Sequence, residues 1–184
     1  MILPTPRRLL PAALLLLVLA LAGLTVAAAT STAHDHHPKR TTQRLVVRGD
    51  ATVKDAPCGG GLCLELSDGA FRGTPVGTGG YSGRVELKIA EGFPNGEGGL
   101  CAPIRGDIVL GAGTPDRLVL AVAGDSCQDG AGNPATSSFT GLARFAVKYG
   151  TGAYAKADGG GIATFAEDAA DHDRMTLVGQ ITTR

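Results

Sequence analysis

Alternating apolar and polar residues, with glycine repeatedly on the apolar side, constrain the fold of this chain more than any other feature. Five segments show this period of two. Their apolar sides are Leu45, Val47, Gly49, Ala51 and Val53; Tyr81, Gly83, Val85, Leu87 and Ile89; Ile104, Gly106, Ile108 and Leu110; Phe139, Gly141, Ala143, Phe145, Val147 and Tyr149; and Met175, Leu177, Gly179 and Ile181. Such alternation predicts strands with one buried face.

Glycine content argues against helices. The chain contains 28 glycines in 184 residues, and each glycine inside a helix costs about 1 kcal/mol relative to alanine. Shorter strand candidates at 62–66, 117–123 and 153–165 bring the total to about eight, separated by turn-rich connections at 91–99 and 124–135. We predict an all-β fold with a single antiparallel eight-stranded β-barrel. Two stacked sheets are the alternative, but glycines on the inner face of five strands favour a strongly coiled barrel.

The N-terminal residues have the pattern of a secretory signal peptide. Arg7 and Arg8 precede a long apolar run, and alanines at 27–29 provide a small-residue cleavage site. An uncleaved membrane anchor is the alternative, because the run approaches the length that spans a bilayer. We predict a signal peptide at 1–29, a flexible histidine-containing tail at 30–42 and the β-barrel domain at 43–184.

Charge disfavours two classes of partner. Cleavage of the signal peptide removes two of the 17 basic residues and none of the 17 acidic ones. Proteins that bind nucleic acid or anionic membranes use clustered positive charge. We therefore expect a secreted, extracellular protein with no nucleic-acid partner and no membrane association after cleavage.

Four cysteines follow the predicted signal peptide: Cys58, Cys63, Cys101 and Cys127. An even number of cysteines in an exported protein indicates disulfides, and three pairings are possible. We favour Cys58–Cys63, which closes a short glycine-rich loop, and Cys101–Cys127, which joins two consecutive strands. A metal site is the alternative, but the spacing lacks paired C-x-x-C motifs and no histidine is nearby.

The pattern Gly-Thr-Gly-x-Tyr occurs twice, at 77–81 and 150–154. The second copy fits the glycine spacing of a dinucleotide-binding turn. That turn must lead into a helix whose N-terminus receives the pyrophosphate, whereas three further glycines follow at 159–161. We predict instead a repeated turn between strands, in which positive-φ glycines make the bend and tyrosine packs over it.

Other candidate sites have simpler interpretations. Arg-Gly-Asp occurs at 48–50 and 105–107, but both copies fall inside alternating segments, which predicts an outward Arg and Asp around an inward glycine. Ser82 also lies in such a segment, and His172 is the one histidine outside the tail that could act as its base, so a hydrolase is improbable.

Two clusters suit metal ions only weakly. His34, Asp35, His36 and His37 could bind copper, nickel or zinc, and the acidic connection at 167–174 could attract calcium. A tail cluster is more often adventitious, and the connection lacks the spacing of a calcium loop. We therefore predict no catalytic, cofactor-binding or metal-binding residues, and no cofactor.

The C-terminal part resembles a known family. Phe139–Phe145 (FTGLARF), the second Gly-Thr-Gly-x-Tyr copy with Ala157, Gly159 and Gly161, and Leu177–Ile181 (LVGQI) look like the closing strands of the allene oxide cyclase and dirigent-type barrels. The resemblance implies an eight-stranded antiparallel barrel with an apolar interior that holds a hydrophobic molecule. In plant members, this cavity steers the cyclisation or coupling of a reactive intermediate.

The predicted interior lacks the groups that such chemistry needs. The apolar sides given above contain no Glu, Asp, Arg or Asn that could polarise a substrate. We therefore expect a non-catalytic binding, surface or structural module whose partner is a hydrophobic small molecule or a protein. The alternative is an isomerase or cyclase that acts on a hydrophobic intermediate inside the barrel.

Overall fold

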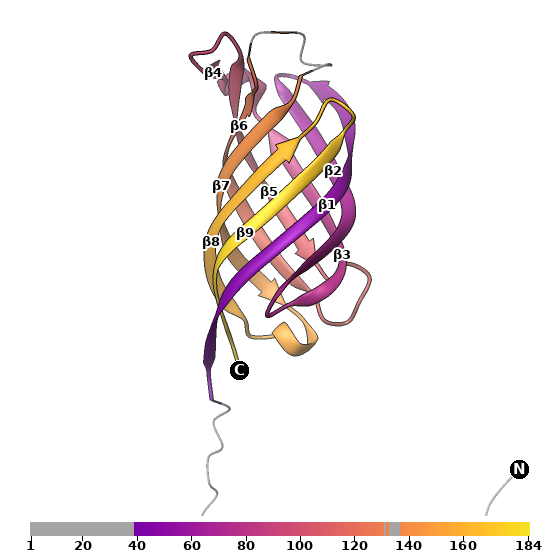
Figure 1. Ribbon diagram of the computed structural model, residues 1–184, viewed down its shortest axis with the longest axis vertical. Helices are drawn as coiled ribbons and strands as arrows, with labels where there is room; N and C mark the ends of the chain where they lie inside the picture. The colour runs from indigo at the N-terminus through magenta and orange to yellow at the C-terminus, as the bar shows by residue number, and fades with distance from the viewer. Residues whose placement is uncertain (1–38, 131, 133–136) are drawn as a thin grey trace, which may run out of the picture. The chain divides into compact units, whose positions relative to one another are not determined.

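The computed structural model of this protein describes residues 39–130, 132 and 137–184. Eight strands of this part form a barrel (Figure 1). They are β1 (Thr41–Gly59), β2 (Leu62–Thr74), β3 (Gly77–Leu87), β5 (Leu100–Leu110), β6 (Leu118–Gln128), β7 (Phe139–Gly150), β8 (Asp158–Glu167) and β9 (His172–Thr183). The connections contain the two-residue strand β4 (Phe93–Pro94) and the 3-10 helices η1 (Ile89–Glu91) and η3 (Gly152–Tyr154). The predicted signal peptide and the histidine cluster at 34–37 lie outside the described residues.

The barrel is a closed meander in which each long strand pairs with the next one along the chain. β3 pairs with β5, and the first strand, β1, pairs with the last, β9, which closes the sheet. β4 adds a short pairing to the start of β5. All of these pairings are antiparallel. The predicted all-β, eight-stranded antiparallel barrel is confirmed, and the alternative of two stacked sheets is wrong.

The two ends of the barrel differ in their connections. The upper end in Figure 1 carries the β1–β2 and β8–β9 turns, the β6–β7 connection and the segment with η1 and β4. The lower end carries the β2–β3, β5–β6 and β7–β8 turns. At the upper end, β1 turns into β2 at Gly60 and Gly61, whose φ angles are 62° and 80°. Positive φ at both central residues is the requirement of a tight two-residue hairpin, and glycine meets it without steric cost.

The apolar sides predicted from the sequence face the barrel interior, with two exceptions. Leu45 and Leu177, for example, are fully buried. Ile89 was expected on the inner face but lies in η1 and is 39% exposed. Tyr149 was also expected inside but is 53% exposed, because β7 shifts its register with β6 between Val147 and Tyr149. The extra residue of this bulge reverses the alternation at the end of the strand.

Gly49 shows why the inner face needs glycine. A Cβ atom at this position would lie 2.7 Å from Cε1 of Tyr81, whose side chain is only 1% exposed. Side chains in a close-packed interior cannot approach to that distance without moving. The ring of Tyr81 therefore occupies space that the missing side chain of Gly49 leaves inside the barrel.

Several strand boundaries were predicted wrongly. β2 continues to Thr74, well beyond the expected segment 62–66, and β6 continues to Gln128 through part of the connection expected at 124–135. β8 begins at Asp158 rather than at 153. β1 begins at Thr41, inside the predicted tail, because its first residues pair with the end of β9.

Both disulfides lie at the upper end. Cys58 and Cys63 are joined across the β1–β2 hairpin, with an S–S distance of 2.02 Å. Cys101 and Cys127 are paired residues of β5 and β6, with an S–S distance of 2.04 Å. These are the two pairings that the spacing favoured. The upper rim of the barrel is therefore cross-linked at two points around its circumference.

The two Gly-Thr-Gly-x-Tyr copies both lie at the lower end but have different structures. In the first copy, Gly77 has a φ of 73° and opens β3, and Tyr81 lies inside the barrel rather than over the turn. In the second, Gly152 has a φ of 54° within η3, and the half-buried Tyr154 packs against the core. The prediction of positive-φ glycines at both bends is confirmed. The packing expected for tyrosine holds only for the second copy.

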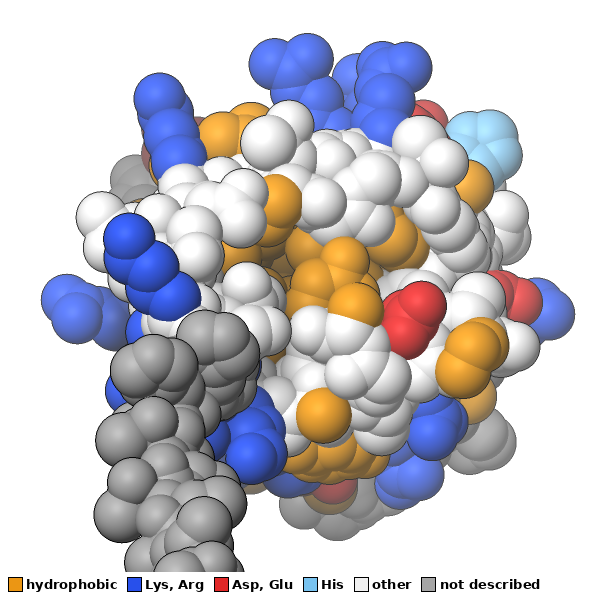
Figure 2. Space-filling model, turned by 90° about the horizontal axis from the view of Figure 1, so that it is seen from below, with side chains coloured by type: hydrophobic (Ala, Val, Ile, Leu, Met, Phe, Trp, Pro, Cys, Tyr) orange, Lys and Arg blue, Asp and Glu red, His pale blue; other side chains and the backbone are white. Residues whose placement is uncertain are grey.

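Apolar side chains fill the lower end. Figure 2 shows them gathered at the centre of this end, with lysine and arginine side chains around the rim. The buried core in this half includes Leu110, Leu118 and Leu120, together with Phe145. A shallow pocket of about 270 Å³ remains between the turns, beside Tyr154.

Candidate functional site

Carboxylates line the interior near the upper end, where the sequence predicted none. Glu65 lies on β2, Glu167 ends β8 and Asp173 lies near the start of β9. Asp173 is two residues from the buried Met175 on β9, so the alternation of that strand turns its side chain inward. The same alternation relates Glu167 to Phe165, whose ring also borders the interior. The expectation of an interior without Glu or Asp side chains is therefore wrong.

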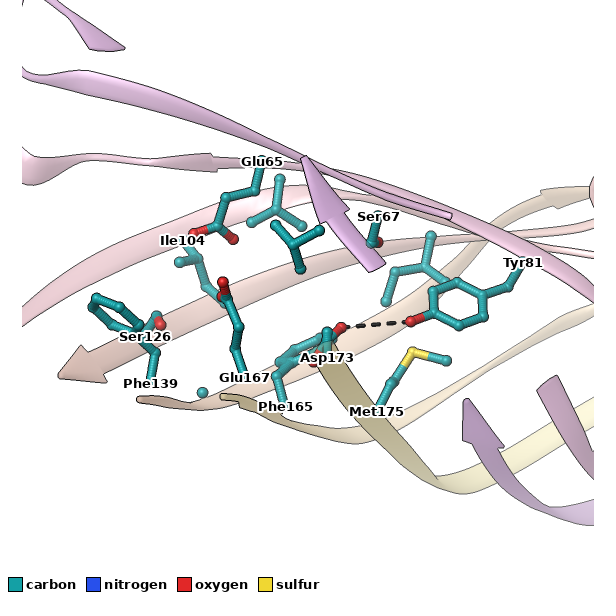
Figure 3. Close-up of a pocket in the computed structure, with 14 residues that line it drawn as sticks. Glu65, Ser67, Tyr81, Ile104, Ser126, Phe139, Phe165, Glu167, Asp173 and Met175 are labelled. Carbon is teal, nitrogen blue, oxygen red and sulfur yellow. Dashed lines mark hydrogen bonds between the residues drawn. The ribbon is translucent and has the colours of Figure 1, made fainter. Parts of the chain in front are cut away.

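These carboxylates border a small inner cavity of about 50 Å³. The cavity is lined by Val53, Glu65, Ser67, Tyr81, Val85, Ile104, Ile108, Ser126, Phe139, Gly141, Phe165, Glu167, Asp173 and Met175. Figure 3 shows the carboxylate ends of Glu65 and Glu167 pointing toward one another, with Asp173 deeper beside Tyr81. One water needs about 10–15 Å³ of cavity volume, so the inner cavity has room for a few waters or a small polar group.

A larger pocket, which we call the vestibule, lies at the mouth of the barrel and has a volume of about 420 Å³. Its lining comprises Cys58, Cys63, Glu65, Leu87, Ile89, Leu100, Ala102, Ser126, Gln128, Phe139 and Glu167. Glu65, Ser126, Phe139 and Glu167 line the inner cavity as well, so the two spaces adjoin at these residues. Volumes of this size are typical of small-molecule sites, which are mostly apolar with a few polar groups.

Asp173 is the least satisfied polar side chain of this site. It is 8% exposed, and its Oδ1 atom is buried without a hydrogen-bond partner. Its Oδ2 atom accepts a hydrogen bond from the hydroxyl of Tyr81 at 3.5 Å, which is long for an O–H···O bond. A buried carboxylate oxygen without a partner is costly, so this position favours either a proton or a ligand that donates to it.

Burial raises the pKa values of both Asp173 and Tyr81. The pKa of Asp173 is raised to about 6, mainly by burial and to a smaller extent by the charge of Asp50, while hydrogen bonds from the Tyr81 hydroxyl and the Ala166 backbone lower it. Burial and the neighbouring Asp173 likewise raise the pKa of Tyr81 far above its usual value, so this phenol stays protonated. At neutral pH, Asp173 is therefore predominantly an anion held in an unfavourable environment.

The side chains that line the inner cavity and the vestibule are apolar, neutral polar or acidic. The residues that line the inner cavity and the vestibule include no lysine, arginine or histidine. Basic residues of the same strands, such as Arg84 and Arg105, face outward and are exposed.

The candidate residues considered from the sequence lie elsewhere. Both Arg-Gly-Asp copies are within strands, β1 and β5, and Asp107 accepts an outer-face salt bridge from Lys148 at 2.7 Å. Ser82 lies on β3, and His172, the histidine considered as its base, is exposed, with its Nδ1 atom 3.7 Å from Oδ2 of Asp168. In the acidic connection at 167–174, Glu167 and Asp173 turn inward and line the inner cavity.

Within the described ranges, no group of three His, Cys, Asp or Glu side chains has an arrangement that could hold a metal ion. In the same part of the chain, no helix has both the length and the apolar composition needed to cross a membrane. Comparison with protein-family models, with curated proteins and with solved structures finds no match for this chain.

Proposed function

We propose that this protein is a secreted, non-catalytic binding module that takes up a small molecule through the vestibule at the upper end of its barrel. One observation carries the proposal: the vestibule of about 420 Å³ adjoins an inner cavity that is lined by Asp173, whose buried Oδ1 atom has no hydrogen-bond partner. A core built only for stability would fill this space with apolar side chains. The two disulfides are consistent with an extracellular protein and support secretion.

The resemblance to the allene oxide cyclase and dirigent-type barrels is part of this proposal. A closed eight-stranded barrel is the fold that the resemblance implies, and the resembling residues form β7, η3, β8 and β9. Barrels of this size also occur in unrelated binding proteins. The resemblance thus supports a ligand inside the barrel, without identifying the ligand.

A cyclase or isomerase is the second candidate, because Asp173 and Tyr81 place ionisable groups inside the cavity. A carboxyl group with a pKa near 6 could exchange a proton with a substrate. The inner cavity of about 50 Å³, however, has no room for the reacting part of a large hydrophobic intermediate. Binding without turnover accounts for the geometry better.

Mapping of fragment binding by NMR tests the proposed function. The probes are a set of small aromatic fragments with equal numbers of amines, alcohols and carboxylic acids, titrated into the isotope-labelled barrel. We expect amide shifts in the upper parts of β2, β6, β8 and β9. Ser126→Phe should abolish them, because Ser126 lines both spaces, whereas Thr78→Phe, in the pocket of the lower end, should leave them unchanged. Shifts restricted to the lower end or the outer face, or no shifts at all, would contradict the proposal.

A further inference from the structure

We infer that the ligand of this site is an apolar small molecule that ends in a hydrogen-bond donor, an O–H or N–H group on a short aliphatic arm. The donor reaches the Oδ1 atom of Asp173 in the inner cavity, and the apolar body occupies the vestibule. This inference rests on the proposed function and specifies its ligand class. Two features of the site carry it: the unpartnered oxygen atom of Asp173, and the different sizes and linings of the two adjoining spaces.

Asp173 provides an acceptor that the protein itself does not use. Its Oδ1 atom is buried without a hydrogen-bond partner, and the residue is only 8% exposed. The hydroxyl of Tyr81 has a single proton, which it donates to the other carboxylate oxygen, Oδ2. A buried acceptor that stays unsatisfied costs its full desolvation penalty. A ligand that donates to Oδ1 therefore gains more than it would gain from an acceptor that is already paired.

The sheet holds this acceptor at the inner cavity. Asp173 pairs with Glu167 of β8 on one side and with Ala51 of β1 on the other. Asp173 and Met175, two residues apart on β9, both line the inner cavity. Figure 3 shows Asp173 beside Met175, with its hydrogen bond to Tyr81. Because both neighbouring strands fix this position, a donor that enters the inner cavity meets the carboxylate in place.

The two spaces set the orientation of the ligand. The inner cavity, at about 50 Å³, accepts a hydroxyl or amino group and one or two attached carbons, but not an aromatic ring. The vestibule, at about 420 Å³, is walled by Leu87, Ile89, Leu100 and Phe139. An apolar or aromatic body therefore fits outside the inner cavity, where burial against these side chains stabilises it.

This arrangement discriminates against ligands that only accept hydrogen bonds. Ketones, ethers and esters offer acceptor atoms alone, and a carboxylic acid has lost its proton at neutral pH. Such a group beside Oδ1 of Asp173 would bring two acceptors together and leave both unsatisfied. A site built to hydrogen-bond an O–H or N–H group rejects the analogue that lacks it, because the buried partner is left unpaired. Alcohols and amines both supply the donor that Oδ1 lacks.

Isothermal titration calorimetry with matched probes tests the inference. Phenethyl alcohol and 2-fluoroethylbenzene have the same body and arm, but the fluorine that replaces the hydroxyl group donates no hydrogen bond. We expect the alcohol to bind at least about tenfold more tightly, as one hydrogen bond to a charged acceptor would give. The same pair with a four-carbon arm covers a longer reach from the vestibule. Phenethylamine, as a further probe, distinguishes an N–H donor from an O–H donor.

Variants of Asp173 assign the preference to its oxygen atom. Asp173→Leu has a similar shape without an acceptor, so the alcohol and the fluoride should bind it within about twofold of each other. Asp173→Asn keeps a carbonyl oxygen and should retain part of the preference. The outer-face variant Asp107→Asn, whose native side chain pairs with Lys148, should keep the full preference. Unfolding curves of each variant show that a loss of binding does not arise from loss of the fold.

The outcomes separate the ligand class from the binding function. If the fluorides bind the vestibule as tightly as the alcohols at both arm lengths, the protein is a small-molecule binder but the donor inference is wrong. If only phenethylamine binds more tightly than the fluoride, the site selects a positive charge rather than a donor, and the inference is also wrong. A preference for the alcohol that persists in Asp173→Leu would place the acceptor elsewhere and overturn the assignment. If no probe binds wild type and Ser126→Phe is indistinguishable from it, both proposals fail.

Discussion

The two halves of the barrel are stabilised in different ways, although the same eight strands run through both. In the lower half, the interior is a packed apolar core that includes the fully buried Leu118 and Leu120. In the upper half, the interior contains three carboxylates, an inner cavity and a vestibule. Both disulfides lie at this upper end. The comparison indicates that packing supports the closed lower end, whereas covalent cross-links support the rim of the open one.

The buried polar side chains show the same division. Within the described part of the chain, these are Gln128 and Asp173, and both lie in the upper half. Gln128 is satisfied, since its Nε2 atom donates to Ser137 Oγ at 2.8 Å and to the Gly132 carbonyl at 3.0 Å. Asp173 retains an oxygen atom without a partner. The side chain of Gln128 therefore stabilises the protein through its own hydrogen bonds. Asp173 has an oxygen atom that is still open to a hydrogen bond from a ligand.

The largest expected effect comes from removing packing in the lower half. Leu120→Ala should destabilise the protein by about 2–5 kcal/mol, because it leaves a cavity in a close-packed core. Leu87→Ala should cost clearly less, because Leu87 already borders the vestibule and its removal only enlarges an open space. Urea-induced unfolding measures both values. Equal losses at the two positions would show that the halves are packed alike.

Removal of the disulfides should weaken the upper half to different extents. Replacing both Cys101 and Cys127 by alanine opens a loop with a sequence separation of 26 residues and should cost about 3.5 kcal/mol. The same change at Cys58 and Cys63, separated by 5 residues, should cost about 2 kcal/mol. Denaturation curves of the two variants give the comparison. If neither change affects stability, the cross-links do not support the rim.

Asp173→Asn should stabilise the unliganded protein by an amount that grows as the pH rises from about 4 to about 6 and then stays constant. The pKa of Asp173 is raised from 3.8 to about 6, so the folded state binds more protons than the unfolded state between these values, and stability falls as the pH rises through them. The accumulated cost is about 3 kcal/mol at neutral pH. Asn lacks the charge and should regain up to this amount, with no gain near pH 4. Thermal unfolding across this pH range measures the effect, and a gain that does not vary with pH would contradict it.

The smallest expected effect concerns the turn with the second Gly-Thr-Gly-x-Tyr copy. Asp116 Oδ1 accepts a hydrogen bond from the Ala153 amide at 2.8 Å and so holds η3 against the β5–β6 turn. Asp116→Ala should cost about 1 kcal/mol. Amide exchange should increase in η3 and remain unchanged around the vestibule. Faster exchange at the upper end as well would mean that the two halves do not respond independently.

The sequence predicts the apolar part of the barrel interior better than the polar part near the upper end. Alternation identifies strands by their apolar inner residues, and it places Leu45, Ile108 and Phe145 correctly inside the barrel. Alternation does not identify Glu65, Ser126, Glu167 and Asp173 as inner residues, because polar residues on the inner face give the strand no apolar side. Counting the period of two backward from Met175 would have placed Asp173 inside. No local pattern could show that Glu65 and Glu167, about a hundred residues apart, face the same cavity.

A crystal structure with para-bromophenethylamine tests the central claim most directly, because the anomalous signal of bromine locates the aromatic end of the ligand without ambiguity. We predict bromine in the vestibule, between Leu87, Leu100 and Phe139. Bromine beside Tyr154 at the lower end, or only on the outer face of the barrel, would contradict the claim that the upper end is a small-molecule binding site.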